Sequence, residues 1–241
     1  MIYEDKFYEE LVETVELIES QNKIKYNIDD KLLILLRNQI VKWIWKVMIL
    51  IDVSKKTIFE AIDIFDSVLE NFDLHDTEDL FKDLNLISIV SMVIASKFQE
   101  VNYIGFDLIQ SLSKTKFRKL EIIKMERLIM LNTPIKVNYL EEFVYLIFKT
   151  FKNSTSSNET FDFKFKVLKY CNIVYFRAVK DYGFYKKRKT LYFYFAVFYI
   201  SVNKSKCVNI DLNNHIFSIA KYFNLKKKSL IECIEELENL I

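Results

Sequence analysis

Apolar residues recur at helical spacing along most of the chain, with steps of three and four positions. The first helix has four such residues on one face and glutamates on the other: Phe7, Leu11, Val15 and Ile18. A polar stretch from about residue 21 to 29 follows, and Asp30 is a good N-cap for the next helix. That helix carries Leu33, Leu36, Ile40, Trp43 and Val47. The pattern predicts a chain of amphipathic helices.

Two segments depart from this amphipathic pattern because they contain no charged residue. Residues 84–96 form a charge-free run of 13 positions, and residues 190–203 form one of 14. A helix that is apolar all round must be buried on every side, so each segment is expected at the centre of a bundle. The two runs begin 106 positions apart, with helices before and after each. We therefore predict an all-α protein of two tandem five-helix domains preceded by an N-terminal helix.

The domain boundaries follow from the polar stretches and from one proline. The N-terminal helix and its linker are assigned to residues 1–30, the first five-helix domain to residues 31–136 and the second to residues 137–241. Pro134 ends the last helix of the first domain, because proline cannot continue a helix. The two halves share negligible sequence identity, so the predicted repeat is one of architecture.

The composition excludes several classes of function. The chain has two glycines and one proline, too few for the tight turns of an all-β fold. Gly105 and Gly183 lie 78 positions apart, so no glycine-rich phosphate-binding loop exists. His75 and His215 have no metal-ligand neighbours at ligand spacing, and the three cysteines form no metal pattern. We expect no catalytic residues, no metal and no cofactor.

Charge and targeting patterns favour a protein inside the cell. The 35 basic and 33 acidic residues give a net charge of +2, so we expect no direct nucleic-acid partner. Widely spaced cysteines at 171, 207 and 233 fit a reducing compartment. The acidic N-terminus is not a signal peptide, and the 14-residue apolar run is too short to span a membrane. The sequence predicts an intracellular, soluble protein without a membrane partner.

Four motifs in the first half resemble the cyclin box. They are residues 36–44 (LRNQIVKWI, similar to M-R-x-I-L-x-D-W-L), 61–69 (AIDIFDSVL, similar to A-V-x-Y-x-D-R-F-L), 84–86 with 94–100 (LNL and IASKFQE, similar to L-Q-L and L-A-S-K-x-E-E) and 124–129 (KMERLI, similar to R-M-E-x-x-I/V). The N-terminal helix is similar to the segment before the box in mitotic A- and B-type cyclins. Residues 185–196 are similar to the Tyr-Pro-Ser-x-x-A-x-A motif of the second cyclin fold, with the proline replaced.

The resemblance implies a regulatory subunit that is not itself an enzyme. A cyclin binds a cyclin-dependent protein kinase as a heterodimer and holds the kinase C-helix inward, so that the catalytic Lys–Glu pair forms. Lys97 matches the family's lysine that donates to kinase backbone carbonyls, and Glu126 matches its glutamate that accepts from kinase N–H groups. The neighbouring residues expected at this kinase-binding surface are Ile94, Phe98, Glu100, Met130 and Ile135.

A second expectation from the resemblance is a docking patch for substrates or inhibitors with Arg-x-Leu motifs. The matching positions are Leu36, Gln39, Ile40, Trp43, Lys46, Leu84 and Asn85. Lys46 replaces an acid that would face the arginine of the ligand, which adds like-charge repulsion. The alternative is that these residues simply pack one helix on another. Lys42 also replaces the family's usual partner of Arg37, which leaves Asp66 or Glu126 as candidate partners.

We therefore expect a cyclin that activates a cyclin-dependent serine/threonine kinase in cell-cycle control, with the mitotic class favoured and a location in nucleus and cytoplasm. One alternative is a transcription-type cyclin or a cyclin-fold basal transcription factor, which would show a basic DNA-facing surface. The other is a cyclin-fold scaffold that no longer binds a kinase, in which charge reversal at Lys97 and Glu126 would have no effect.

Overall fold

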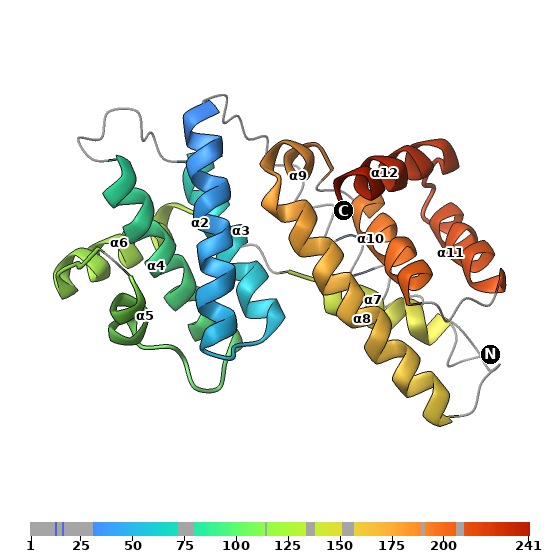
Figure 1. Cartoon of the computed structure of the whole chain (residues 1–241), viewed down its shortest axis with the longest axis horizontal. Helices are drawn as coiled ribbons and strands as arrows, with labels where there is room; N and C mark the ends of the chain where they lie inside the picture. The colour runs from blue at the N-terminus through green and yellow to red at the C-terminus, as the bar shows by residue number, and fades with distance from the viewer. Residues whose placement is uncertain are drawn as a thin grey trace. The chain divides into compact units, whose positions relative to one another are not determined.

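A computed structural model describes residues 31–71, 80–113, 115–133, 138–150, 157–188, 191–205 and 210–241, together with residues 13 and 16. All regular structure within these ranges is helical, which confirms the predicted all-α class (Figure 1). The predicted N-terminal helix lies outside the described residues except for Glu13 and Glu16. The described helices divide between two compact units, and the chain passes from one to the other between Asn138 and Tyr139.

Five described helices build the first unit, four of them packed around a central one. They are α2 (Lys31–Leu50), α3 (Lys55–Asn71), α4 (Leu80–Gln99), α5 (Phe106–Leu112) and α6 (Lys119–Asn132). Helix α4 packs against each of the other four. Every residue of the charge-free run 84–96 is buried except Asn85, as the absence of charge predicts. The buried run ends at Ser96, and Lys97 is the first exposed residue after it, within the last turn of α4.

Helix α3 is buried over 13 consecutive residues and includes three carboxylates, Glu60, Asp63 and Asp66. Buried carboxylates must be paired or hydrogen-bonded, because transfer of an unpaired charge from water is very unfavourable. Asp66 is bound by Arg37 of α2, and Glu60 accepts a hydrogen bond from the side chain of Gln99 at the end of α4. The polar groups inside this unit therefore join its helices to one another.

The second unit repeats the plan with aromatic residues in the core. Its helices are α7 (Leu140–Thr150), α8 (Ser157–Lys180), α9 (Tyr182–Arg188), α10 (Leu191–Lys204), α11 (Ile210–Tyr222) and α12 (Lys227–Leu240). Helix α10 contacts α7, α8, α11 and α12. Edge-to-face contacts join Phe143 to Phe195 and Phe148 to Phe198, with ring centroids 5.1 and 5.3 Å apart. The short helix α9 is an addition to the five helices predicted for this half.

None of the helices in the described part of the chain combines the length and the apolar character that a membrane span requires.

Candidate functional site

A lysine at the end of α4 and a glutamate on α6 form an ion pair on the surface of the first unit. The ammonium group of Lys97 donates to Oε1 of Glu126, from a helix end where the dipole favours a cation. The side chains are 41% and 26% exposed. An ion pair with this exposure contributes only about 0–1 kcal/mol to stability. The two groups therefore satisfy each other in the free protein and can be separated at little cost.

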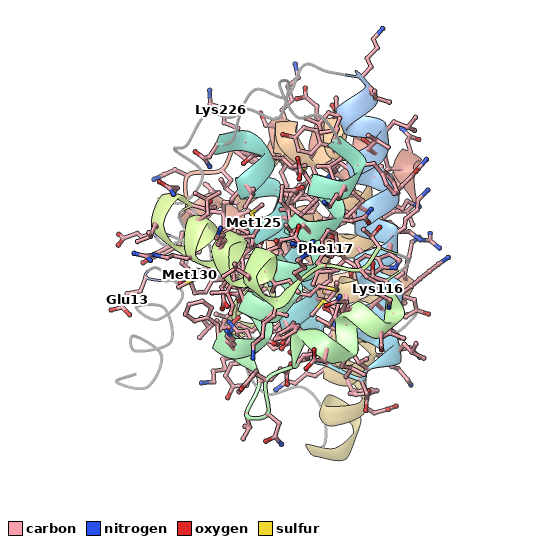
Figure 2. All side chains as sticks on the ribbon, turned by 90° about the vertical axis from the view of Figure 1, so that its left-hand side faces the viewer. Glu13, Lys116, Phe117, Met125, Met130 and Lys226 are labelled. Carbon is pink, nitrogen blue, oxygen red and sulfur yellow. The ribbon has the colours of Figure 1, made fainter. Side chains whose placement is uncertain are left out.

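Large apolar side chains flank this ion pair. Phe98, next to Lys97, is 54% exposed, and Met130, one helical turn beyond Glu126, is 46% exposed. Figure 2 shows Met125 and Met130 along α6, with Met130 towards its C-terminal end. Exposed apolar groups around a few convergent polar groups are typical of a surface that a partner covers. The arrangement can offer one cationic donor, one carboxylate acceptor and a patch of apolar area.

Two further exposed residues of this surface are missing from the sequence-based set. Val101 and Tyr103 follow α4 directly, and both are exposed. The ammonium group of Lys97 lies 6.0 Å from the centre of the Tyr103 ring, so the aromatic face adds to the electrostatic environment of the lysine. Their proximity to Lys97 in the sequence is the signal that identifies them, because the segment leaving a helix end lies near that end.

Ile94 does not belong to the surface, which corrects one expectation from the sequence. Its side chain is only 1% exposed, because it lies within the part of α4 that all neighbouring helices surround. It supports the last turn of α4 from inside and offers no contact area to a partner. Ile135 lies outside the described residues.

Glu100 is engaged within the unit. Its carboxylate accepts hydrogen bonds from the backbone N–H of Ser54, at 2.9 Å, and from the hydroxyl of Thr57. Partial burial disfavours the charged carboxylate, but these hydrogen bonds outweigh that effect and lower the pKa of Glu100. Ser54 also caps α3, since its hydroxyl accepts from the N–H of Thr57 at 3.1 Å. Glu100 thus ties the end of α4, which carries Lys97, to the start of α3.

The partner of Arg37 is Asp66. Nε of Arg37 donates to Oδ1 at 2.9 Å and Nη2 donates to Oδ2 at 2.6 Å, and both side chains are buried. Of the two candidate partners left open by the sequence, the structure selects Asp66. Glu126 is thereby free of Arg37 and pairs with Lys97 instead.

The residues of the expected docking patch fall into three groups. Ile40 and Leu84 are buried where α2 packs on α4, so neither offers contact area to a peptide. Leu36, Trp43 and Asn85 are partly exposed, and Gln39 and Lys46 are exposed. Two members of the predicted patch therefore serve helix packing, as the alternative interpretation holds. The exposed cations Lys42 and Lys46 repel an incoming arginine.

The side chains of Ser201 and Cys171 are not available as nucleophiles, because the serine hydroxyl is hydrogen-bonded and the cysteine thiol stays protonated. The hydroxyl of Ser201 is buried and donates to the carbonyl of Val197 at 2.6 Å. Burial raises the pKa of the Cys171 thiol to about 12, so the reactive thiolate does not form near neutral pH. Among the described residues, no group of three His, Cys, Asp or Glu side chains is placed to hold a metal ion.

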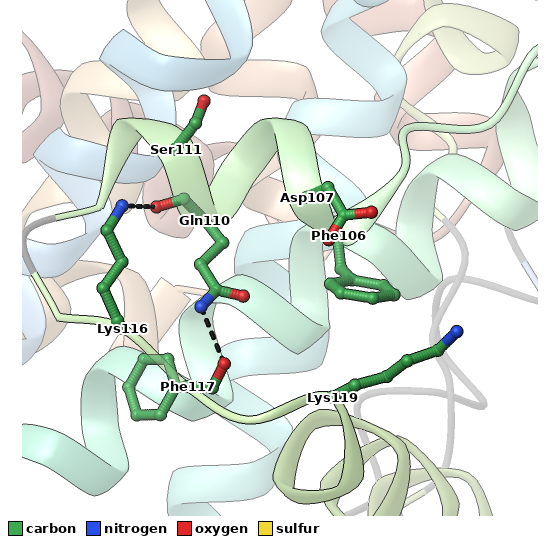
Figure 3. Close-up of a pocket in the computed structure, with 7 residues that line it drawn as sticks. All are labelled: Phe106, Asp107, Gln110, Ser111, Lys116, Phe117 and Lys119. Atoms are coloured by element: carbon green, nitrogen blue, oxygen red, sulfur yellow. Dashed lines mark hydrogen bonds between the residues drawn. The ribbon is translucent and has the colours of Figure 1, made fainter.

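A depression of about 440 Å³ lies between α5 and the segment leading into α6 (Figure 3). Two polar side chains that line it, Lys116 and Gln110, form hydrogen bonds across it. Lys116 donates to the carbonyl of Gln110 at 2.7 Å, and the side-chain amide of Gln110 donates to the carbonyl of Phe117 at 2.7 Å. Because these groups complete the loop between the helices, we assign the depression to packing of α5.

Comparisons with known proteins identify a family for this chain. The chain matches the family model described as "Cyclin, N-terminal domain" over residues 7–133, a range that contains helices α2 to α6 with Lys97 and Glu126. It is 20% identical over 139 residues to the putative cyclin-B3-1 of Arabidopsis thaliana. That match covers 58% of this chain and 34% of the relative, so the aligned part is about a third of the relative's length.

Proposed function

Because the chain belongs to the cyclin family, we propose that it is a regulatory subunit that binds and activates a cyclin-dependent serine/threonine protein kinase. The observation that carries the proposal is the exposed Lys97–Glu126 ion pair between Phe98 and Met130. These residues lie within the matched region, on α4 and α6, where the resemblance to the cyclin box leads us to expect the kinase contacts.

The ion pair is suited to open when a partner binds. Lys97 has three N–H donors for carbonyl groups at the end of a partner helix or loop, and Glu126 has two oxygens for backbone N–H groups. Each new hydrogen bond to a charged group is worth about 1.5–3 kcal/mol, more than the exposed pair that is given up. Burial of Phe98 and Met130 adds about 1.5–3 kcal/mol for each side chain that becomes fully covered.

Activation follows from where such a complex holds the kinase. A partner surface that binds the C-helix of a kinase in its inward position completes the Lys–Glu pair that orients the ATP phosphates. In this role the chain supplies positioning and no reacting group. Glu100 does not contact the kinase in this proposal. It accepts hydrogen bonds from Ser54 and Thr57 and so holds the end of α4, which carries Lys97, in place.

We extend the proposal to cell-cycle control of the mitotic type, acting in nucleus and cytoplasm. The name of the plant relative, a putative B3-type cyclin, supports the mitotic assignment, as does the similarity of the N-terminal segment to mitotic cyclins. Docking of Arg-x-Leu motifs is left out of the proposal, because Lys42 and Lys46 disfavour a basic ligand.

Binding is tested by calorimetric titration of the purified chain with cyclin-dependent kinases of its source organism. The double variant Lys97→Ala/Glu126→Ala should weaken binding by about 2–5 kcal/mol, since it truncates charged groups that the complex buries. The matched control is Lys82→Ala/Glu121→Gln. It removes another surface ion pair between α4 and α6, at 3.7 Å, while the glutamine still accepts from the N–H of Arg118. Equal affinity of both variants would overturn the assigned site, and no binding by the wild type would overturn the function.

A further inference from the structure

The outward face of α6 carries large apolar side chains that are exposed. Leu120, Leu128 and Leu131 are 60%, 41% and 71% exposed, and Lys124 and Arg127 lie between them. Successive members of this set are separated by four, three, one and three positions, which places all five on one face of the helix. We call this set the α6 ridge. Exposed leucines gathered in this way mark a surface that another molecule covers.

The leucines of the α6 ridge lie on a different face of the helix from Glu126. Each residue of a helix turns about 100°, so Leu131 lies roughly 140° around the axis from Glu126. The buried residues Ile122 and Ile129 define the side of α6 that faces the core, and the ridge lies on the opposite side. A molecule on the ridge would therefore contact a different face of α6 from the one that carries Glu126, while Met130, three positions after Arg127, lies at the edge of the ridge.

The charges of the α6 ridge are all positive. Lys124 and Arg127 have no ion-pair or hydrogen-bond partner among the described residues. The two glutamates of the helix are engaged elsewhere: Glu121 binds the N–H of Arg118 and lies 3.7 Å from Lys82, and Glu126 binds Lys97. The ridge thus combines apolar area with two cations that the carboxylates of the same helix do not pair with.

We propose that the α6 ridge is a docking surface for an acidic amphipathic helix of a partner protein. Apolar residues of such a helix at spacings of three and four would cover the leucines, and carboxylates along its edge would reach Lys124 and Arg127. A second copy of this chain fits less well, because its ridge would bring the same cations into one interface. The proposal does not depend on the roles of Lys97 and Glu126.

The test uses fluorescence anisotropy with the full chain and two synthetic 18-residue peptides. The acidic peptide has Leu at alternating three- and four-residue spacing, Glu at the flanking positions and one lactam bridge to hold the helix. The basic peptide has Lys in place of each Glu. The acidic peptide should bind the wild type, and Lys124→Glu/Arg127→Glu should weaken it by about tenfold or more. The charge-reversed variant should bind the basic peptide instead.

Three control variants test whether peptide binding depends on the α6 ridge itself. Leu120→Ser/Leu131→Ser should also lose about tenfold in affinity, because it removes the apolar contact. Lys221→Glu/Lys228→Glu, an equal charge reversal at exposed lysines of the second unit, should leave binding unchanged. Lys97→Ala/Glu126→Ala should bind the acidic peptide with unchanged affinity, so failure of the kinase proposal would not affect this result. Circular dichroism verifies that each variant is folded.

Several outcomes would overturn the proposal. One is that the acidic peptide does not bind, and another is that the ridge variants bind it as well as the wild type does. Sedimentation that shows a dimer of the wild type, lost in Leu120→Ser/Leu131→Ser, would assign the ridge to a second copy. Binding of a DNA duplex that depends on Lys124 and Arg127 while the acidic peptide does not bind would assign it to nucleic acid.

Discussion

Arg37 of α2 and Asp66 of α3 are joined by two hydrogen bonds, of 2.9 and 2.6 Å, in a site where both side chains are buried. The two residues are 29 positions apart in the chain, so the pair fixes the rotation of one helix against the other. Asn38 accepts a further hydrogen bond from Nη1 of Arg37 at 3.1 Å. The bidentate geometry makes this the internal polar link between α2 and α3 of the first unit.

Removal of the carboxylate should therefore be costly. Asp66→Ala removes the carboxylate that accepts two hydrogen bonds from a buried guanidinium, and the free energy of unfolding should fall by about 3–5 kcal/mol. Urea denaturation followed by circular dichroism measures this change. Arg37→Leu/Asp66→Leu should be less destabilised than Asp66→Ala, because both charges of the pair are removed together. A loss of under about 1 kcal/mol for Asp66→Ala would show that the ion pair contributes little to the fold.

A second prediction concerns the contribution of Glu100 to stability at acidic pH. Its folded pKa lies below the ordinary value of 4.5, so its contribution to stability is complete above that value and is lost as the pH falls through the lowered pKa. Glu100→Gln removes the ionisable group and should flatten the dependence of unfolding free energy on pH in that acidic range. Urea midpoints of wild type and variant, compared below about pH 4.5, check it. Parallel curves would contradict the assignment.

His215 predicts a pH effect in a different range. Burial lowers the pKa of its imidazole in the folded protein below 6.5, and a hydrogen bond to the backbone of Thr150 opposes that only in part. The unfolded chain therefore binds the proton more readily, and stability falls as the pH drops below 6.5. His215→Gln should remove this part of the pH dependence. A slope between about pH 7 and 5.5 that the substitution leaves unchanged would contradict it.

The buried thiol of Cys171 gives a fourth prediction. With its pKa raised to about 12, it should not react with a thiol reagent at neutral pH while the protein is folded. Cys233 is buried as well, so a Cys207→Ser variant should show almost no reaction until denaturant is added. Rapid reaction of this folded variant would mean that one of these helical faces opens to solvent.

The centre of each unit was predictable from the sequence because a helix buried on all sides contains no charged residues. A run of 13 or 14 residues without charge is compatible only with a helix surrounded by others, and α4 and α10 occupy those positions. The motif positions of Lys97 and Glu126 were predictable as well. Their ion pair was not, because it depends on how α6 lies across the end of α4.

Other features depend on tertiary contacts that periodicity does not report. The choice of Asp66 over Glu126 as the partner of Arg37 requires the rotation of α3 about its own axis. The burial of Ile94 depends on how closely the neighbouring helices surround the end of α4. Helix α9 is a short segment of seven residues between two longer helices, too short for an apolar period to appear.

The central claim is that Lys97 and Glu126 bind a kinase and do more than hold α4 to α6. The exchange Lys97→Glu/Glu126→Lys tests it most directly, because it keeps an ion pair between the two helices but places the donor and the acceptor at each other's positions. The measurement is the rate at which a cyclin-dependent kinase phosphorylates a substrate in the presence of the wild type or of this variant. Both proteins are first verified as folded. We predict that the variant has normal stability and does not activate the kinase. Activation equal to that of the wild type would contradict the claim, because the ion pair would then serve only the fold.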